Sequence, residues 1–175
     1  MIKKARTNSG FTLIELILVI AIIALLAAAS IATLSKFNRQ QNLNIDLDEL
    51  QNTLAEAKSL AAANVVTGCK SPTPGVLVGY QVTINPPTTY SVQEVCQYDS
   101  NPAGTNTPIP APAEKIHHLH GSTFTSAPPS PNNFVRFIVL SGGVSAARSM
   151  TIRSTSGGGS KTINVTSDGV INVAP

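Results

Sequence analysis

Residues 10–35 read GFTLIELILVIAIIALLAAASIATLS, an apolar stretch that holds a single charged residue, Glu15, and no proline. About 20 residues of α-helix span roughly 30 Å, which is the thickness of the hydrocarbon core of a bilayer. Three cations precede the stretch within the first ten residues, as is typical of a segment that stays on the cytoplasmic side. We therefore predict a membrane-spanning helix over 11–35.

Glu15 is the unusual residue, because a carboxylate in a lipid-facing helix costs at least about 2.5 to 3.5 kcal/mol and should have a function and a partner. In their spacing, Gly10, Phe11 and Glu15 resemble the prepilin cleavage motif of type IV pilins and pseudopilins. The resemblance implies that a prepilin peptidase removes residues 1–10 by cutting after Gly10, and that it methylates the new amine of Phe11. It also implies that Glu15 meets the N-terminal amine of a neighbouring subunit during assembly.

The same resemblance supplies the expected partners and location. The partners are prepilin peptidase, other pilin or pseudopilin subunits, the assembly machinery of the inner membrane and the lipid bilayer. The precursor would cross the inner membrane once, with its N-terminus in the cytoplasm and its globular domain outside it, and would then be extracted into a filament. No cofactor is implied.

Two plainer interpretations of the N-terminal stretch compete with this one. A secretory signal needs a basic start, an apolar core and small residues before the cleavage site, and the alanines at 27–29 before Ser30 meet that pattern. An ordinary membrane anchor would explain the apolar run alone. A buried acid contributes nothing to either, so Glu15 behind Gly10 and Phe11 favours the prepilin motif.

Charge and composition narrow the function further. The 175 residues include 12 basic and 9 acidic side chains, and three of the cations, Lys3, Lys4 and Arg6, lie before Gly10. Residues 11–175 therefore carry nine of each sign, and their net charge gives no reason to expect a polyanionic partner. Charged residues make up only 12% of the sequence, which has 12 glycines, 12 prolines and no tryptophan, a composition typical of turns and short strands.

The helical pattern continues without a breaker over residues 36–64. Leucines and alanines recur there at steps of three and four residues, which places them on one stripe of an α-helix. We predict that this amphipathic half packs on the globular domain, because the stripe is too short for a coiled coil. The stripe consists of Leu43, Leu47, Leu50, Leu54, Ala57 and Ala61. The polar residues expected off the stripe, facing water or neighbouring subunits, are Asp46, Asp48, Glu49, Gln51, Asn52 and Glu56.

The globular domain, residues 65–175, is predicted to consist of short antiparallel strands. Residues 76–84 alternate with period two, which places Val76, Val78 and Tyr80 on one face, and a turn then leads to a returning strand at 89–98. A long helix whose stripe covers one sheet of about six strands makes an α+β fold. Further strands are expected at 115–120, 134–140, 150–154, 161–166 and 170–173, with proline-rich loops at 101–112 and 126–133.

Cys69 and Cys96 are the two cysteines of the sequence, and both follow the predicted membrane helix. They should therefore lie in an oxidising, extracytoplasmic compartment, where a disulfide is expected. Bridging them would close a loop of roughly 28 residues and stabilise the fold by about 3 to 4 kcal/mol in the chain-entropy model. The alternative is a pair of buried thiols that pack as small hydrophobes.

Beyond the motif, the order of parts is similar to that of minor pseudopilins of the H/FimT type, and residues 161–173 resemble the last hairpin of that family. Major pilins often carry a helix-kinking proline in the membrane half of the helix. This chain has no proline before Pro72, which favours a pseudopilin or a minor pilin. Some FimT-like proteins bind DNA through arginines near the last hairpin, but this turn contains Asp168 and no arginine, so DNA binding is not expected.

Three histidines, His117, His118 and His120, form the one cluster that resembles a metal site. In a strand His118 and His120 share a face, whereas His117 points away. Zinc would need further ligands from other segments, so a solvated strand edge is the favoured interpretation. The sequence contains no nucleophile elbow and no phosphate loop of Walker spacing, and we predict no catalytic residue.

These observations predict a structural subunit without enzymatic activity, a minor pilin or pseudopilin of a type IV pilus-like or type II secretion filament. The alternative is a filament-tip module that captures DNA or a surface ligand, and an anchored enzyme ranks third. The basic residues from position 115 onward would separate the first two, because a compact basic face favours binding and scatter favours a plain subunit. These residues are Lys115, Arg136, Arg148, Arg153 and Lys161.

Overall fold

A computed structural model describes residues 11–69, 75–98, 107–109, 115–128 and 133–174, without the side chains of 28–33 and 107–109. The predicted leader therefore lies outside the described residues. The chain divides into two compact units, Met1–Asn38 and Arg39–Pro175. One long helix and two antiparallel sheets confirm the predicted α+β class.

The helix α1 runs over Leu13–Ala62, close to the predicted span of 11–64. It begins after Thr12, whose Oγ1 accepts a hydrogen bond of 3.3 Å from the backbone N–H of Glu15, so Thr12 is the N-cap. It ends before Asn64, which has a φ of 50°. A left-handed residue just beyond the last turn is a common helix stop, and asparagine tolerates this conformation better than most residues.

In the first unit, every described side chain is exposed, both in residues 11–27 and in residues 34–38. The exposed apolar residues include Phe11, Leu13, Ile14, Leu25 and Leu26. The sequence predicts a membrane-spanning helix over 11–35. Among the residues whose side chains are described, we find no helix with both the length and the apolar character needed to cross a membrane.

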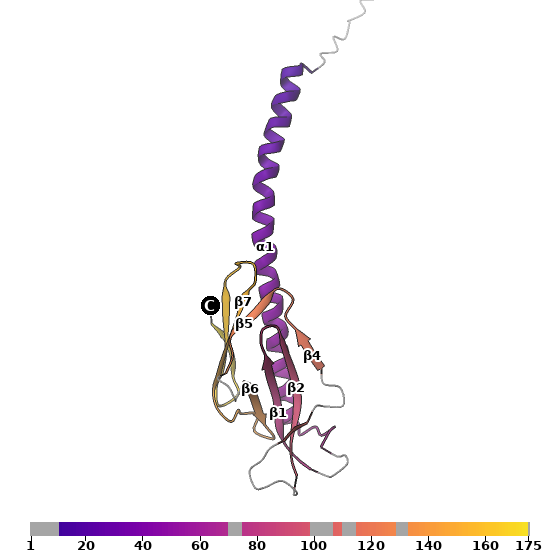
Figure 1. The fold of residues 1–175 in the computed structure, drawn as a ribbon, viewed down its shortest axis with the longest axis vertical. Coiled ribbons are helices and arrows are strands. Elements are labelled where there is room, and N and C mark those ends of the chain that lie inside the picture. The colour runs from indigo at the N-terminus through magenta and orange to yellow at the C-terminus, as the bar shows by residue number, and fades with distance from the viewer. Residues whose placement is uncertain (1–10, 70–74, 99–106, 110–114, 129–132, 175) are drawn as a thin grey trace, which may run out of the picture. The chain divides into compact units, whose positions relative to one another are not determined.

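In the second unit, the stripe of α1 is buried as predicted. Its six residues have exposed fractions between 0% and 7%, and they belong to one hydrophobic core together with strands of both sheets. Figure 1 shows both sheets alongside this part of the helix. The expectation for the polar residues was partly wrong. Asp48, Asn52 and Glu56 are exposed, but Glu49 and Gln51 are half-buried and Asp46 is fully buried.

The first sheet has the strand order β3-β2-β1-β6, with β4 also paired to β2. The predicted hairpin at its centre is confirmed, because β1 and β2 pair from Val76↔Gln97 to Asn85↔Thr89. The strand β3 lies in a segment predicted as a loop. The strands are β1 (Val76–Asn85), β2 (Thr89–Gln97), β3 (Thr107–Ile109), β4 (Lys115–His118) and β6 (Phe134–Ile138).

The simple alternation predicted for β1 was wrong at its start. Leu77 is buried and Val76 is 71% exposed, whereas Tyr80 is buried as predicted. The cause is an irregularity in pairing with β2 between Leu77 and Gly79, where one extra residue shifts the phase of the side chains. Gly79 is required there, because a Cβ atom at this position would lie 2.1 Å from the carbonyl oxygen of Phe137.

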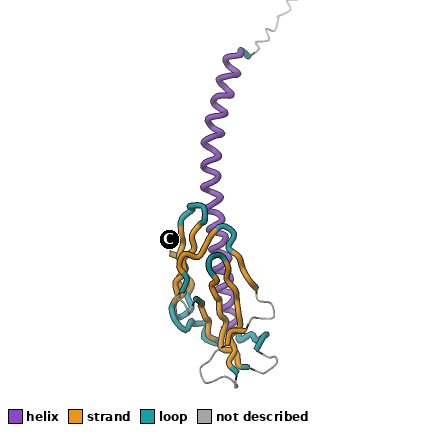
Figure 2. The backbone as a smooth tube through the Cα atoms, in the orientation of Figure 1, coloured by secondary structure: helices purple, strands orange, loops and turns teal. Residues whose placement is uncertain are grey.

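The remaining strands form a second sheet, in contrast to the single sheet that was predicted. Its order is β5-β7-β8-β9, and all pairs are antiparallel. The sequence did not reveal β5, whose residues are mostly hydroxyl-bearing, and β5 pairs with β7 at one edge of the second sheet. The strands are β5 (Ser122–Ser126), β7 (Arg148–Ser154), β8 (Ser160–Val165) and β9 (Ile171–Ala174). Short loops over 155–159 and 166–170 join β7 to β8 and β8 to β9 (Figure 2).

Candidate functional site

The N-terminal motif forms the start of α1, and its acidic residue, Glu15, is exposed to solvent. Thr12 and Glu15 stand in the spacing of a capping box, and the Thr12 hydroxyl accepts from the Glu15 backbone N–H. The Glu15 residue itself is exposed. Around it the apolar side chains are exposed as well, with fractions of 84% for Phe11 and 77% for Leu13. Gly10 lies outside the described residues, so the cleavage position stays a prediction.

The end of α1 is tied to the first sheet by a disulfide and a buried carboxylate. Cys69 and Cys96 are bonded, with their Cα atoms 5.7 Å apart, and both are fully buried, so the expected bridge is present. Glu94, two residues before Cys96 on β2, is also fully buried. Its Oε1 accepts from the backbone N–H of Thr67 at 3.0 Å, and its Oε2 accepts from the N–H of Gly68 at 2.7 Å.

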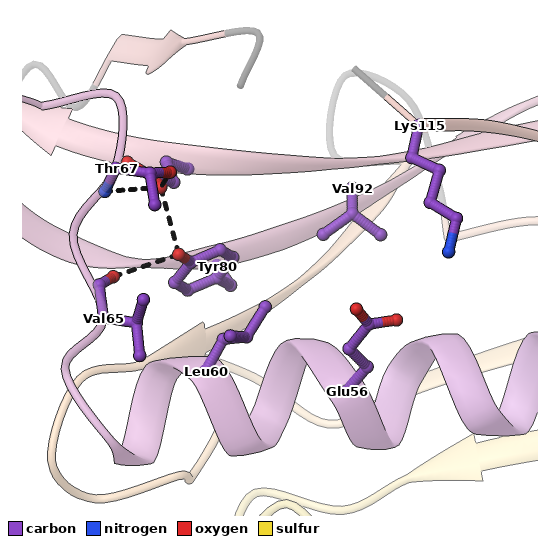
Figure 3. Close-up of a pocket in the computed structure, with 8 residues that line it drawn as sticks. Glu56, Leu60, Val65, Thr67, Tyr80, Val92 and Lys115 are labelled. Carbon is purple, nitrogen blue, oxygen red and sulfur yellow. Dashed lines mark hydrogen bonds between the residues drawn. The ribbon is translucent and has the colours of Figure 1, made fainter. Parts of the chain in front are cut away.

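Two hydroxyl groups complete the shell of Glu94. Thr67 Oγ1 donates to Glu94 Oε1, and Tyr80 Oη lies 3.0 Å from Glu94 Oε1 and 3.0 Å from the carbonyl oxygen of Val65 (Figure 3). Burial alone would raise the pKa of Glu94, but the hydrogen bonds from Thr67, Gly68 and Tyr80 outweigh it and lower the pKa. Burial and the neighbouring Glu94 carboxylate raise the pKa of the Tyr80 hydroxyl. Glu94 is therefore ionised, and its carboxylate binds the backbone of the segment that follows α1, at Thr67 and Gly68.

The same corner contains the one set of three potential metal ligands among the described residues. Ligand atoms of Cys69, Glu94 and Cys96 lie within 4.8 Å of one another. Metal ions bind cysteine as the thiolate, and both sulfur atoms are used in the disulfide. These three residues are accordingly a disulfide and a buried carboxylate, and not a metal site.

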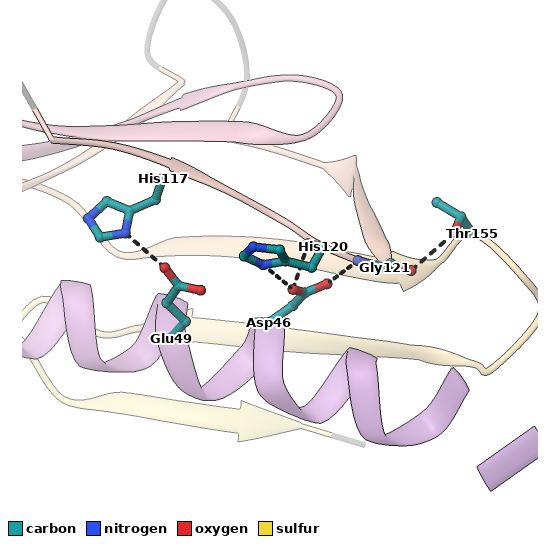
Figure 4. A network of polar contacts seen from close by, with 6 residues as sticks. All are labelled: Asp46, Glu49, His117, His120, Gly121 and Thr155. Carbon is teal, nitrogen blue, oxygen red and sulfur yellow. Dashed lines mark hydrogen bonds and ion pairs between the residues drawn. The ribbon is translucent and has the colours of Figure 1, made fainter. Parts of the chain in front are cut away.

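The histidine segment meets two acids of the helix (Figure 4). His117 Nδ1 lies 3.0 Å from Glu49 Oε1, and the His117 ring stacks on Tyr90 with a centroid distance of 5.0 Å. His120 Nδ1 lies 3.7 Å from Asp46 Oδ1. The favoured interpretation of a solvated strand edge is therefore wrong for His117, whose side chain is only 10% exposed, while His118 and His120 are exposed.

Asp46 also binds the backbone of the segment that follows β4. Its two carboxylate oxygens accept backbone hydrogen bonds from His120 at 2.8 Å and from Gly121 at 3.0 Å (Figure 4). These bonds fix the bend between β4 and β5, where the chain passes from the first sheet to the second. The bend packs tightly against α1, because a Cβ atom on Gly121 would lie 2.9 Å from the Cβ of Asn42.

Sequence reasoning missed Asp46 and Glu94, although a signal existed for each. Asp46 is three residues after Leu43 and four before Leu50, so the helical period places it on the buried stripe. Glu94 follows Tyr90 at an even spacing on β2, the face that is buried. An acid in phase with buried residues indicates an internal hydrogen-bond partner.

The basic residues of the second unit are spread over both sheets. Arg136 on β6 is half-buried, with its Nη2 2.8 Å from Gln81 Oε1 and its guanidinium over the ring of Phe134. On β7, Arg148 shares the face of Met150, whereas Arg153 is on the other face. This arrangement is scattered and gives no continuous basic face among these residues.

A cavity of about 200 Å³ lies between α1, the segment that follows it and strands of the first sheet. Tyr80 and Thr67 form one end of it (Figure 3), and Glu94, which is hydrogen-bonded to both, lines the cavity with them. Leu60 and Val92 line the middle, Val65 lies beside Tyr80, and Glu56 and Lys115 lie at the other end (Figure 3).

Comparison with known protein families gives a match at the start of the chain. Residues 5–31 match the family model described as the prokaryotic N-terminal methylation motif. This motif is the signature of type IV pilins and pseudopilins. No curated protein matches the chain. No solved structure matches it either.

Proposed function

We infer from the methylation motif that this chain is a structural subunit of a pilin-like filament, and we propose that it is a minor pilin or pseudopilin of a type IV pilus-like or type II secretion filament. The motif match at residues 5–31 carries the proposal. The β8–β9 hairpin at the end of the chain and the long helix before a strand-rich unit support the H/FimT type of minor pseudopilin.

The exposed first part of α1 supports an assembly role. In residues 11–27 the helix presents apolar side chains in every direction, together with one exposed acid. Such a surface is unfavourable in water and needs a cover of lipid or of other apolar helices. We propose that the bilayer covers it in the precursor, and that the helices of neighbouring subunits cover it in the filament. Glu15 would then meet the N-terminal amine of a neighbour, which supplies its missing countercharge.

Processing is the first test of this proposal. Prepilin peptidase should cleave between Gly10 and Phe11 and methylate the Phe11 amine, with the N-terminus on the cytoplasmic side of the inner membrane. The intact mass of the protein extracted from membranes should show the loss of Met1 to Gly10 and the gain of one methyl group. A mature chain that starts at Ser30 would instead establish a secretory signal and overturn the proposal.

We also propose that the second unit does not capture DNA. The scatter of Arg136, Arg148 and Arg153 supports this, because tight binding requires several phosphate contacts from one surface. A fluorescence titration with double-stranded DNA at physiological ionic strength should show no micromolar binding. Micromolar affinity that is lost in the triple variant Arg136→Gln/Arg148→Gln/Arg153→Gln would favour the tip-module alternative.

A further inference from the structure

The cavity beside α1 is lined by apolar and charged side chains, and two of the charged ones make no recorded hydrogen bond or ion pair with another described residue. At one end, the polar atoms of Glu94, Tyr80 and Thr67 are bonded to one another, and Glu94 is fully buried although Thr67 is exposed. A ligand therefore meets the ring of Tyr80 there, but it finds no free charge. The volume of about 200 Å³ is below the roughly 300 to 1,000 Å³ of pockets for drug-sized ligands. Only a small molecule fits.

The middle of the cavity is apolar. Leu60 reaches into it from the helix and Val92 from β2, while Val65, in the segment that follows the helix, lies beside Tyr80 at the first end (Figure 3). Branched aliphatic side chains on several sides favour an aliphatic group of the ligand, because burying such a group removes apolar surface from water.

The other end carries one charge of each sign. Glu56 extends from α1 and Lys115 from β4, and the two charged groups point toward the same space (Figure 3). Both residues are exposed. The structure records no hydrogen bond or ion pair between either side chain and another described residue. A cation and an anion that face one space in this way would bind a ligand carrying both an ammonium and a carboxylate group.

We propose that this cavity binds a free α-amino acid with an aliphatic side chain. The ammonium group lies against Glu56 and the carboxylate against Lys115, while the side chain extends between Leu60 and Val92 toward the ring of Tyr80. The ends of a peptide chain do not fit as well, because each end carries only one of the two charges. The proposal does not depend on filament assembly, since all the lining residues belong to the second unit.

The test uses the full chain in detergent, with carbon-13 labels in the leucine and valine methyl groups. L-Leucine should shift the methyl signals of Leu60, Val65 and Val92 in a saturable way, with a dissociation constant of about 1 mM, as expected for so small a ligand. N-acetyl-L-leucine lacks the ammonium group, L-leucinamide lacks the carboxylate, and glycine lacks the aliphatic side chain. Each should bind about tenfold more weakly or worse.

Matched variants separate the charges of the cavity from charge in general. Glu56→Gln and Lys115→Gln should each weaken leucine binding about tenfold. The controls Asp48→Asn, an exposed acid on the same helix, and Arg153→Gln, an exposed cation on the second sheet, should leave it unchanged. The absence of saturable shifts at tens of millimolar leucine would overturn the proposal, as would equal binding of leucinamide or leucine binding that survives both cavity variants. Equal binding of leucinamide would identify the site as one for peptide N-termini.

Discussion

The two halves of α1 each place an acid among apolar residues, and they satisfy it in different ways. In the first half Glu15 is exposed, and so are the apolar side chains around it. In the second half Asp46 is fully buried between Leu43 and Leu50, and it accepts two backbone hydrogen bonds from the bend at His120 and Gly121. One continuous helix thus combines a surface that is covered by its own chain with one that is not.

The difference shows where each half finds its partners. The second half is stabilised within the chain, because its stripe, Asp46 and Glu49 all contact strands or the bend between the sheets. The described apolar side chains of the first half are exposed, so we propose that other molecules cover them. Mutations in the two halves should therefore affect different measurements, with assembly for the first and folding stability for the second.

The largest expected effect is on assembly. Glu15→Ala removes the proposed partner of a neighbour's N-terminal amine, while it lowers the cost of membrane insertion by about 2.5 to 3.5 kcal/mol. The variant should reach the membrane at normal or higher levels and be nearly absent from sheared filaments. Quantitative immunoblots of both fractions measure this, with Asp48→Ala as the control that should assemble normally. Normal incorporation of Glu15→Ala would remove the countercharge role.

Loss of the disulfide should have the largest effect on stability. Replacing Cys69 and Cys96 by serine opens a loop with a sequence separation of 27 residues and should lower the free energy of unfolding by about 3 to 4 kcal/mol. Chemical unfolding followed by near-ultraviolet circular dichroism of the tyrosines measures this. The incorporation into filaments at permissive temperature should change far less than for Glu15→Ala. Two free thiols in protein recovered without reductant would contradict the disulfide itself.

The parts of this fold that the sequence predicted are those with a periodic apolar signal. The stripe on α1, the β1–β2 hairpin and the α+β class follow from spacing alone. The bulge at Gly79 and the separation into two sheets do not, because both depend on which strands meet. The strand β5 is short and mostly polar, so its place beside β7 comes from tertiary packing and from the bend that Asp46 fixes.

Glu94→Gln should lower the free energy of unfolding by about 3 kcal/mol at neutral pH, because it replaces a buried, fully accepted carboxylate with an amide that brings its own donors. The folded pKa of Glu94 is lowered from the ordinary 4.5. Its contribution is thus fully present above pH 4.5 and is lost as the pH falls through the folded value. Unfolding of both proteins between pH 7 and pH 3 should show the difference narrowing at the acid end. A constant difference over this range would contradict an ionised Glu94.

Asp46→Ala should cost about 2 kcal/mol, because it leaves two backbone N–H groups without their acceptor. The matched control is Asp48→Ala, an exposed acid two residues away, which should stay within about 0.5 kcal/mol of the parent. Hydrogen exchange at His120 and Gly121 adds a local measurement, and it should become faster in Asp46→Ala alone. Equal stability of the two variants would place Asp46 with Glu15, as an acid that the chain itself does not satisfy.

The candidate sites were predictable to different degrees, for a physical reason. Gly10, Phe11 and Glu15 lie within six consecutive residues, so the sequence alone identifies them. The cavity brings together Glu56, Lys115 and Glu94 from a helix and two strands, and no local spacing relates these residues. The pairing of His117 with Glu49 has the same origin, since 68 residues separate them.

The smallest expected effect tests whether that pairing stabilises the fold. Glu49 is 36% exposed, so solvent screens its interaction with His117 and a double-mutant cycle with Glu49→Gln and His117→Gln should give a coupling below about 1 kcal/mol. The stack of His117 on Tyr90 should remain in Glu49→Gln, because it does not involve the carboxylate. If the pair is ionic, the coupling should fall as salt rises from 0.05 to about 0.5 M. A coupling as large as the cost of Asp46→Ala would mean that Glu49 stabilises the contact between α1 and the segment before β5 as much as Asp46 does.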